Sequence, residues 1–409
     1  MGDGPNVTQL DQHSRLPLAE LTIVQRGKML PSKEQRPPAT ARSNLTHPTS
    51  RAELSCVARA ASAPRRWVRV MMSIAAAAVT LLMMGTAGAV RAQAVSTAQC
   101  SDHFFAATMN LSSVTMHGRL CLPSGVTNPT LEILVPGATY SGVYWDSPVV
   151  NGAYSYVQHA NAAGYATLAL DRISTGQSSR PLSVQLSSTG QAQVVHQVIG
   201  LARSAGLAGT PFSHIVLVGH SLGSMITVVE ATTYHDVDGV ILTGFSHGLA
   251  VPGVLNAYVA GLIPAVLDPA FGLGYDPGYL TTLAGQRERL FHASADVDPA
   301  VIAWDEQTKS VMTATEQADG MAISVVLNTT LQISVPVLLG NGSVDQFFCG
   351  ATVDCSTDQT LAASESAYFS SAAQLSTTVL PGAGHNNALA ANAGAFYAAA
   401  NLWIATHFS

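Results

Sequence analysis

Residues 214–231 read HIVLVGHSLGSMITVVEA, and they decide the fold of this chain. The apolar run 214–219 predicts a buried strand, and residues 224–232 predict the helix that follows it. Between them, GHSLG matches the pattern G-x-S-x-G and places Ser221 at a strand-to-helix turn, where flanking glycines permit a tight backbone. This context favours a nucleophilic serine over an ordinary glycine-rich turn.

Strand-like and helix-like segments alternate on both sides of this turn. A helix is predicted at 191–205, where apolar residues recur at helical spacing before Gly206, and an alanine-rich helix is predicted near the C-terminus. Further strands are predicted at 131–135, 165–170, 237–244, 334–340 and 376–380. The alternation is typical of an α/β fold, in which helices cover a mainly parallel sheet.

One long interval, residues 249–332, interrupts this alternation. It contains five prolines and six of the fourteen aspartates that follow residue 94, and it shows no clear strand. Such a length is too great for one connection in a compact domain. We therefore predict an inserted helical cap at 249–332 on an α/β core formed by 95–248 and 333–409. A cap over the C-terminal edge of the sheet is where substrate selection is expected.

The charges of the chain divide at residue 94. Residues 1–94 hold 12 basic and 5 acidic side chains, whereas residues 95–409 hold 7 basic and 20 acidic ones, with Lys309 as the single lysine. An acidic body of this kind lacks the basic stripe that binds a phosphate backbone, so nucleic acid is not an expected partner. The abundance of Val, Leu, Ile and Ala argues against disorder.

The basic N-terminal part contains the pattern of an export signal. Residues 71–90 are uncharged, three arginines between residues 65 and 69 precede them, and RAQA follows at 91–94. This layout predicts a signal peptide at 65–94, cleaved after Ala94 or at the second site 87–89, and a secreted protein. A permanent membrane anchor is the alternative, because 20 uncharged residues can span a bilayer.

Residues 1–64 precede that signal and show no sustained periodicity. They are polar and contain Pro31, Pro37, Pro38, Pro48 and Pro64, among other prolines, so we expect no fold there. A signal normally begins a chain, and translation from a methionine near residue 71 is therefore an alternative reading.

The cysteines agree with export. Removal of the leader leaves four, which allow three pairings, and we favour the local one because each pair shares a short segment. Zinc is the competing reading, since His103 and His117 lie close to the first pair, but C-x-x-C is missing and an exported chain favours disulfides. The predicted pairs are Cys100–Cys121 and Cys349–Cys355.

A serine hydroxyl needs a histidine base that a carboxylate orients. Asp345 follows a predicted strand in NGSVD, and His385 lies in PGAGHNNAL after the next one. The order Ser221, Asp345, His385 is the order expected for a serine at a strand-to-helix turn. The helix that follows the serine presents free N–H groups, and the N–H of Leu222 is one predicted oxyanion donor.

The sequence offers other acids and bases besides this triad. Asp354 and Asp358 are rival acids in or near the second disulfide loop, and Glu365 is a rival acid in a predicted helix. His247 is the rival base because it follows a strand in GFSHG, and we interpret it as a wall of the substrate pocket. The remaining candidates, His196 and His235, are interpreted as structural.

These residues and their order resemble the α/β-hydrolase superfamily, in particular its secreted serine esterases and lipases with a cap. The resemblance extends over residues 95–409. It implies that the loop after the third strand supplies the second oxyanion donor, which here is the N–H of Ala138. Pro136 stands where many family members carry a histidine. The segment DRISTGQS at 171–178 is similar to the family turn D-x-x-G-x-G-x-S, which implies structural roles for Asp171 and Arg172.

The predicted reaction is the transfer of an acyl group from an ester to water through an acyl-enzyme, without a metal or organic cofactor. The low charge suggests a neutral, apolar small-molecule or lipid ester. Amidase, peptidase or acyltransferase chemistry on the same triad is the alternative. A non-enzymatic alternative is a binding module that kept the fold without catalytic activity. Three aromatic residues just past the oxyanion loop are expected to wall the substrate pocket, namely Tyr140, Tyr144 and Trp145.

Overall fold

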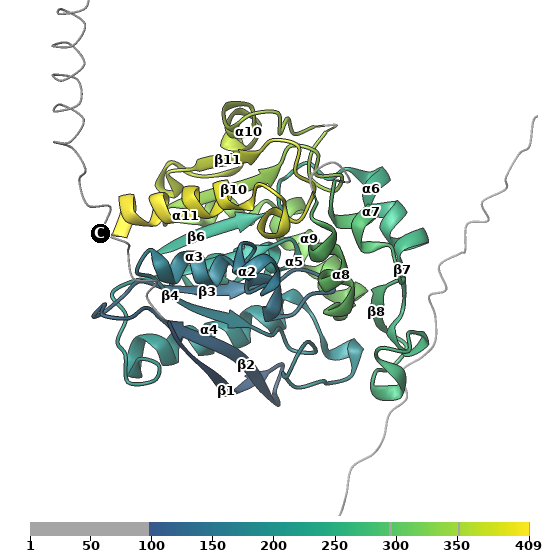
Figure 1. Cartoon of the computed structure of the whole chain (residues 1–409), viewed down its shortest axis with the longest axis horizontal. Helices are drawn as coiled ribbons and strands as arrows, with labels where there is room; N and C mark the ends of the chain where they lie inside the picture. Colours follow the sequence, from purple (N-terminus) through teal and green to yellow (C-terminus); the bar gives the residue numbers. More distant parts are fainter. Residues whose placement is uncertain (1–97, 294–296, 351, 409) are drawn as a thin grey trace, which may run out of the picture. The chain divides into compact units, whose positions relative to one another are not determined.

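The computed structural model of the chain describes residues 98–293, 297–350 and 352–408 (Figure 1). The predictions of a leader at 1–64 and of a signal peptide at 65–94 concern residues outside this part. Among the described residues, no helix combines the length and the apolar character needed to cross a membrane.

An eight-stranded sheet forms the centre of the described part, in the order β1-β2-β4-β3-β5-β6-β10-β11. β2 runs antiparallel to its neighbours, and the pairs from β4 to β11 are parallel. Every residue of the five strands from β4 to β10 in this order is buried, which explains why they read as apolar runs without alternation. The strands are β1 (Gln99–Met109), β2 (Ser112–Leu122), β3 (Leu131–Val135), β4 (Ala166–Leu170), β5 (Ile215–His220), β6 (Gly239–Thr243), β10 (Val337–Gly342) and β11 (Ser376–Leu380).

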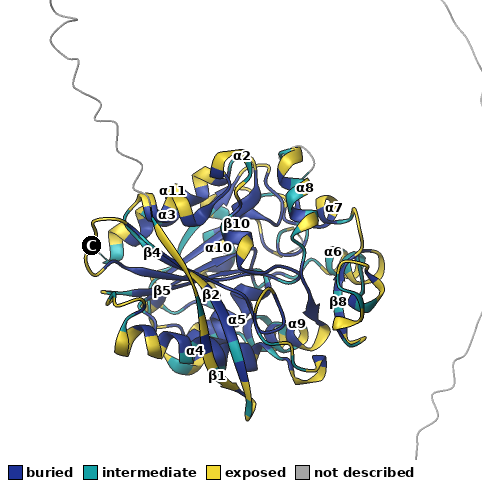
Figure 2. Cartoon of the chain, turned by 60° about the horizontal axis from the view of Figure 1, so that its bottom comes forward, coloured by how far each residue is buried: buried dark blue, intermediate teal, exposed yellow. Residues whose placement is uncertain are grey.

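Helices cover both faces of the sheet, which confirms the predicted fold class. Figure 2 shows α3 and α11 on one face and α4 and α5 on the other. The Ser187 side chain caps α4 by accepting the N–H of Gly190 at 3.0 Å, and Gly206 follows the last helical residue with a φ of +66°, which suits glycine. The helices are α2 (Val149–Gly152), α3 (Tyr156–Ala162), α4 (Ser188–Ala205), α5 (Leu222–Tyr234), α10 (Asp358–Glu365) and α11 (Ala393–Phe408).

The first two strands form a hairpin that the sequence analysis did not predict. Asn110 and Leu111 form its tight turn with φ values of +47° and +70°. Cys100 and Cys121 are directly paired across the two strands and form a disulfide. The predicted pairing of these cysteines is thus present. His117, a residue of the competing zinc interpretation, instead forms a hydrogen bond with Asp171 at 2.8 Å.

The interval 249–332 contains helices and also a small antiparallel sheet in the order β7-β8-β9. The predicted helical cap did not include these strands, because strands of two to four residues are too short to leave a periodic pattern. Most of these elements lie beyond the carboxyl ends of the parallel strands (Figure 1). They are α6 (Val251–Asn256), β7 (Leu262–Pro264), β8 (Tyr279–Thr282), α7 (Arg287–Phe291), α8 (Pro299–Gln307), β9 (Met312–Thr313) and α9 (Ala314–Met321).

A carboxyl group lies in the middle of the sheet, on β3. Glu132 is fully buried, its Oε2 accepts the hydroxyl of Tyr156, and its Oε1 has no hydrogen-bond partner. Burial raises the pKa of Glu132 from its ordinary value of 4.5 to about 8. Between about pH 4.5 and pH 8, the folded protein therefore keeps a proton on Glu132 that the unfolded chain releases.

The substitution Glu132→Gln is expected to remove a pH dependence of stability. In the wild type, this carboxyl lowers stability progressively as the pH rises from 4.5 to about 8. The neutral amide avoids this loss, so the stability of the variant relative to the wild type should rise by about 4 kcal/mol between pH 5 and pH 9. Urea unfolding of both proteins at the two pH values measures the gain, and a stability difference that does not change with pH would contradict it.

Candidate active site

Ser221 occupies a strained turn between β5 and α5. Its φ and ψ are +55° and −118°, a conformation that side-chain-bearing residues rarely adopt. Gly219 and Gly223 stand where the backbone leaves no room for a side chain. A Cβ at Gly219 would lie 2.5 Å from the Cα of Ser224, and one at Gly223 would lie 2.1 Å from the carbonyl oxygen of Val135. The G-x-S-x-G pattern therefore has a direct steric origin.

His385 and Asp345 form a buried pair at the ends of adjacent strands. The Nδ1 of His385 donates to Oδ2 of Asp345 at 2.8 Å, and the side chains are 3% and 0% exposed. Oδ1 of Asp345 accepts the backbone N–H of Phe347 at 2.8 Å. A carboxylate fixed in this way holds the proton on Nδ1, so Nε2 is left as the basic nitrogen.

Ser221 and His385 line one cavity with a volume of about 70 Å³, and Ala138 lines it as well. Two glycines permit this approach of separate loops. A Cβ at Gly137 would lie 3.1 Å from the Cβ of Ser221, and one at Gly244 would lie 2.9 Å from Cε1 of His385. The cavity therefore brings together the predicted nucleophile, the predicted base and the predicted oxyanion loop.

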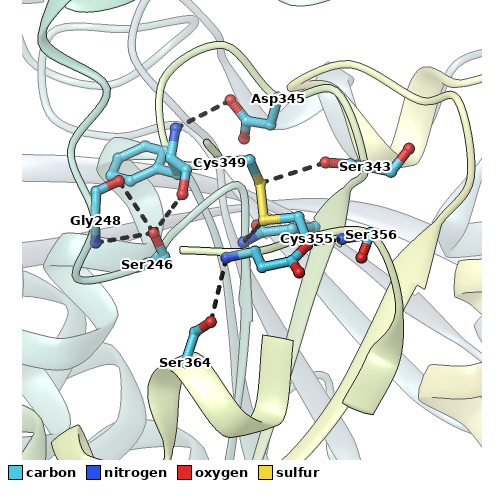
Figure 3. Close-up of a disulfide and its surroundings, with 12 residues drawn as sticks. Ser246, Gly248, Ser343, Asp345, Cys349, Cys355, Ser356 and Ser364 are labelled. Atoms are coloured by element: carbon cyan, nitrogen blue, oxygen red, sulfur yellow. Dashed lines mark hydrogen bonds between the residues drawn. A yellow bond between two sulfur atoms is a disulfide. The ribbon is translucent and has the colours of Figure 1, made fainter. Parts of the chain in front are cut away.

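The second disulfide lies immediately after the turn that holds Asp345 (Figure 3). Cys349 pairs with Cys355, as predicted, and the N–H of Cys349 donates to the carbonyl of Asp345 at 3.2 Å. Ser246 supports the same turn by donating its hydroxyl to the carbonyl of Phe348 at 2.6 Å. These contacts restrict the loop that carries the carboxylate.

The oxyanion loop is held by two buried arginines. Arg172 donates to the carbonyl of Gly137 at 3.1 Å, and Arg287 donates to Oγ1 of Thr139 at 3.0 Å. Thr139 has a φ of +61°, and its carbonyl also accepts the N–H of Ser310 at 2.8 Å. Arg287 and Ser310 come from the 249–332 interval. That interval therefore shapes the loop that is expected to hold the oxyanion.

The turn that follows β4 does not join its two charged residues to each other. Arg172 pairs with Glu316 at 2.9 Å, whereas Asp171 accepts the N–H of Gly142 at 2.8 Å and bonds His117. Both side chains are buried and serve structural contacts.

A buried polar network continues behind the oxyanion loop. Asp305 on α8 pairs with Arg287 at 2.9 Å, accepts the hydroxyl of Tyr140 at 3.1 Å, and bonds Nε2 of His292 at 2.9 Å. Burial opposes ionisation of Asp305, but the charge of Arg287 and the bond to His292 outweigh it and keep the pKa of Asp305 low. This network could not be predicted from the sequence, because its members lie on separate segments without a motif.

The wall of the cavity is mainly apolar. No Asp, Glu, Lys or Arg lines it among the described residues, and Thr139 and Gln317 are polar members besides Ser221 and His385. Much of the wall comes from the 249–332 interval, including Val254, Leu262, Met312 and Met321.

The aromatic residues predicted to wall the pocket lie elsewhere. Tyr140, Tyr144 and Trp145 are almost fully buried and do not line the cavity that holds Ser221. Tyr144 stacks on His220 with ring centroids 4.6 Å apart, and Trp145 packs against Tyr156. These rings fill the core behind the nucleophile, because the chain turns inward directly after the oxyanion loop.

His247 and Glu365, a rival base and a rival acid, pair with each other. The Nδ1 of His247 donates to Glu365 at 2.6 Å, its ring stacks on Tyr368, and it does not line the cavity. Of the other rival acids, Asp354 is exposed and Asp358 accepts the N–H of Val379. The described structure thus gives none of these residues a place beside Ser221.

Comparisons with known proteins agree with this geometry. A sequence model of the alpha/beta hydrolase family matches residues 133–400. A comparison with curated proteins finds no match. Among solved structures, an esterase from Thermogutta terrifontis with bound malate is 15% identical, with 76% of this chain and 100% of that one covered and a TM-score of 0.53. A carboxyl esterase from Bacillus coagulans in complex with glycerol is also 15% identical, with 76% and 99% covered and a TM-score of 0.51.

At such identity the two structures support a shared fold, whereas the family match covers well over half of the chain. The sheet order, the serine turn and this match together place the protein: it belongs to the alpha/beta hydrolase family.

Proposed function

We propose that this protein is a serine hydrolase that cleaves carboxylic esters, with Ser221 as nucleophile, His385 as base and Asp345 as the group that orients the base. The observation that carries the proposal is the single cavity lined by Ser221 and His385, in which the histidine donates its Nδ1 proton to a buried carboxylate. We also propose that residues 65–94 direct export and that the mature protein begins at Val95.

The proposed reaction has two steps. Nε2 of His385 takes the proton of the Ser221 hydroxyl while the oxygen attacks the ester carbonyl, and the imidazolium then protonates the departing alcohol. Water attacks the acyl-enzyme with the same base, which releases the acid and restores the serine. Leu222 is the first residue of α5, whose first-turn N–H groups have no carbonyl partner within the helix, so its amide supports the oxyanion together with that of Ala138.

The apolar wall favours an uncharged acyl group as the part of the substrate that enters the cavity. The two similar structures named above are described as esterases, which supports the choice of an ester over an amide. An amidase, a peptidase or an acyltransferase would use the same residues and is the alternative.

A panel of nitrophenyl esters with acetyl, butyryl, octanoyl and dodecanoyl groups tests the proposal, beside the matching nitroanilides. Saturable release of nitrophenol, with the anilides cleaved far more slowly, is the expected result. Faster cleavage of the anilides would favour an amidase. Release no faster than that of the Ser221→Ala protein would contradict the proposed hydrolase.

Substitution of Arg287 by methionine is expected to lower kcat for the best ester by about 10- to 100-fold with little change in KM. The oxyanion loop then loses its bond at Thr139, and loss of one oxyanion donor costs about 10²- to 10³-fold. Arg289→Met is the matched control, because the side chain of this exposed arginine donates to Gln286 at 2.8 Å and does not line the cavity. Thermal unfolding of each variant must accompany the assay, because Arg287→Met also removes the ion-pair partner of buried Asp305 and can lower stability. Equal kcat values for the two folded variants would contradict a positioning role.

A further inference from the structure

A second cluster of chemically active side chains lies at the other end of α5 from Ser221. His196 on α4, Glu230 on α5 and Asp236 just after α5 bring an imidazole nitrogen and two carboxylate oxygens within 4.8 Å of one another. Nδ1 of His196 lies 2.7 Å from Oδ2 of Asp236. Among the described residues, no other group of three such side chains is placed in this way.

Glu230 is the unusual member of the cluster. The residue is 0% exposed, and no N–H group among the described residues donates to either oxygen of its carboxylate, whose near neighbour is the carboxylate of Asp236. An ionised carboxylate buried without a partner costs several kcal/mol. The nearby cation, Arg203, is already engaged by the carbonyl of Asp236 and the carboxylate of Asp238, at 2.7 Å each. In the described part of the chain, no N–H group donates to Oδ1 of Asp236.

We propose that His196, Glu230 and Asp236 bind a divalent transition-metal cation, with zinc as the best match. Calcium and magnesium favour all-oxygen sites, whereas zinc accepts imidazole nitrogen and carboxylate oxygen at about 2.0–2.2 Å. Two carboxylates balance the charge of the ion, and a cation gives Glu230 the partner that it lacks.

The geometry needs only small side-chain rotations to accept the ion. Ligand atoms on one zinc ion are at most about 4.2 Å apart, since each bond is about 2.1 Å long, so a spread of 4.8 Å must close slightly. The side chains of His196 and Asp236 are 38% and 21% exposed, which leaves them room to rotate and leaves a route for the ion and its water ligands. Tyr234 already stacks on the His196 ring at 3.9 Å and orients it.

The proposed ion stabilises the fold and takes no part in catalysis. It links α4 to the end of α5 and to the connection toward β6. Nine residues of helix, about 13 Å, separate Glu230 from Ser221, so the site is independent of the ester chemistry.

Calorimetric titration of the chelator-treated full chain with zinc chloride tests the proposal, together with thermal unfolding at each zinc concentration. The wild type should bind one zinc ion at this site and unfold at a higher temperature with zinc. His196→Gln and Glu230→Gln should each weaken this binding at least tenfold and remove the shift in unfolding temperature. His214→Gln is the matched control, because His214 is another half-exposed histidine beside an aspartate, 4.0 Å from Asp238.

Two outcomes would overturn the proposal. One is no zinc binding by the wild type, and the other is binding that His196→Gln leaves unchanged. In either case Glu230 simply holds a proton beside Asp236, and Glu230→Gln should then leave the protein equally stable or more stable without any metal. Should Glu230→Gln fail to fold, the half-exposed position of His196 still provides a decisive variant. Ester hydrolysis plays no part in these measurements, so failure of the proposed activity leaves them interpretable.

Discussion

Replacing Ser221 with alanine is expected to lower kcat for ester hydrolysis by about 10⁴-fold or more and to leave KM nearly unchanged. The hydroxyl is the proposed attacking group, and residual turnover would come from the oxyanion donors and from binding alone. The fold should persist, because the turn is held by the backbone bond from the N–H of Ser221 to Thr243 at 2.8 Å. Initial rates with the best ester and circular dichroism of both proteins measure these effects.

Ser213→Ala provides the matched control for that substitution. Ser213 is exposed and lies shortly before β5. Ser213→Ala therefore also removes a serine hydroxyl near this strand, but one that does not line the cavity. Its kcat should stay within twofold of the wild type. If Ser221→Ala kept a comparable rate, the nucleophile would have to lie elsewhere.

The second large effect is expected from Asp345→Asn, which should lower kcat by about 10⁴-fold while the protein stays folded. The amide oxygen can still accept the N–H of Phe347, but the amide nitrogen then donates toward Nδ1 of His385. The histidine proton moves to Nε2, and the ring can no longer accept the proton of Ser221. Steady-state kinetics and thermal unfolding measure the two properties separately.

Asp354→Asn is the control for the charge that Asp345→Asn removes. Asp354 was a rival acid in the sequence, and it lies exposed beyond the turn that holds Asp345. We expect its kcat to be unchanged. A larger loss of kcat from Asp354→Asn than from Asp345→Asn would show that Asp345 is not the carboxylate that orients His385.

The core of the fold was predictable because its signals are local. The strand before Ser221, the glycines around it and the helix after it all fall within one short segment, and steric contact explains each glycine. Asp345 and His385 could be named from their places after strands, since parallel strands deliver their following loops to one edge of the sheet. The structure brings these two side chains into contact, and His385 lines the cavity with Ser221.

What escaped prediction depends on contacts between distant segments. The bond from Arg287 to Thr139 joins residues 148 positions apart, and neither position belongs to a motif. The three short strands in the 249–332 interval follow from packing rather than from periodicity. Tyr140 and Tyr144 were misplaced for a related reason: nearness to the oxyanion loop in sequence does not decide whether a ring faces the cavity or the core.

Covalent labelling with a fluorophosphonate, located by peptide mass spectrometry, tests the central claim most directly. Such a reagent reacts with a serine that a neighbouring base activates. The folded wild type should carry one adduct per chain on Ser221, Ser221→Ala should carry none, and His385→Ala should react far more slowly. Folded protein without an adduct on Ser221, or with an equally rapid adduct on another serine, would contradict the account.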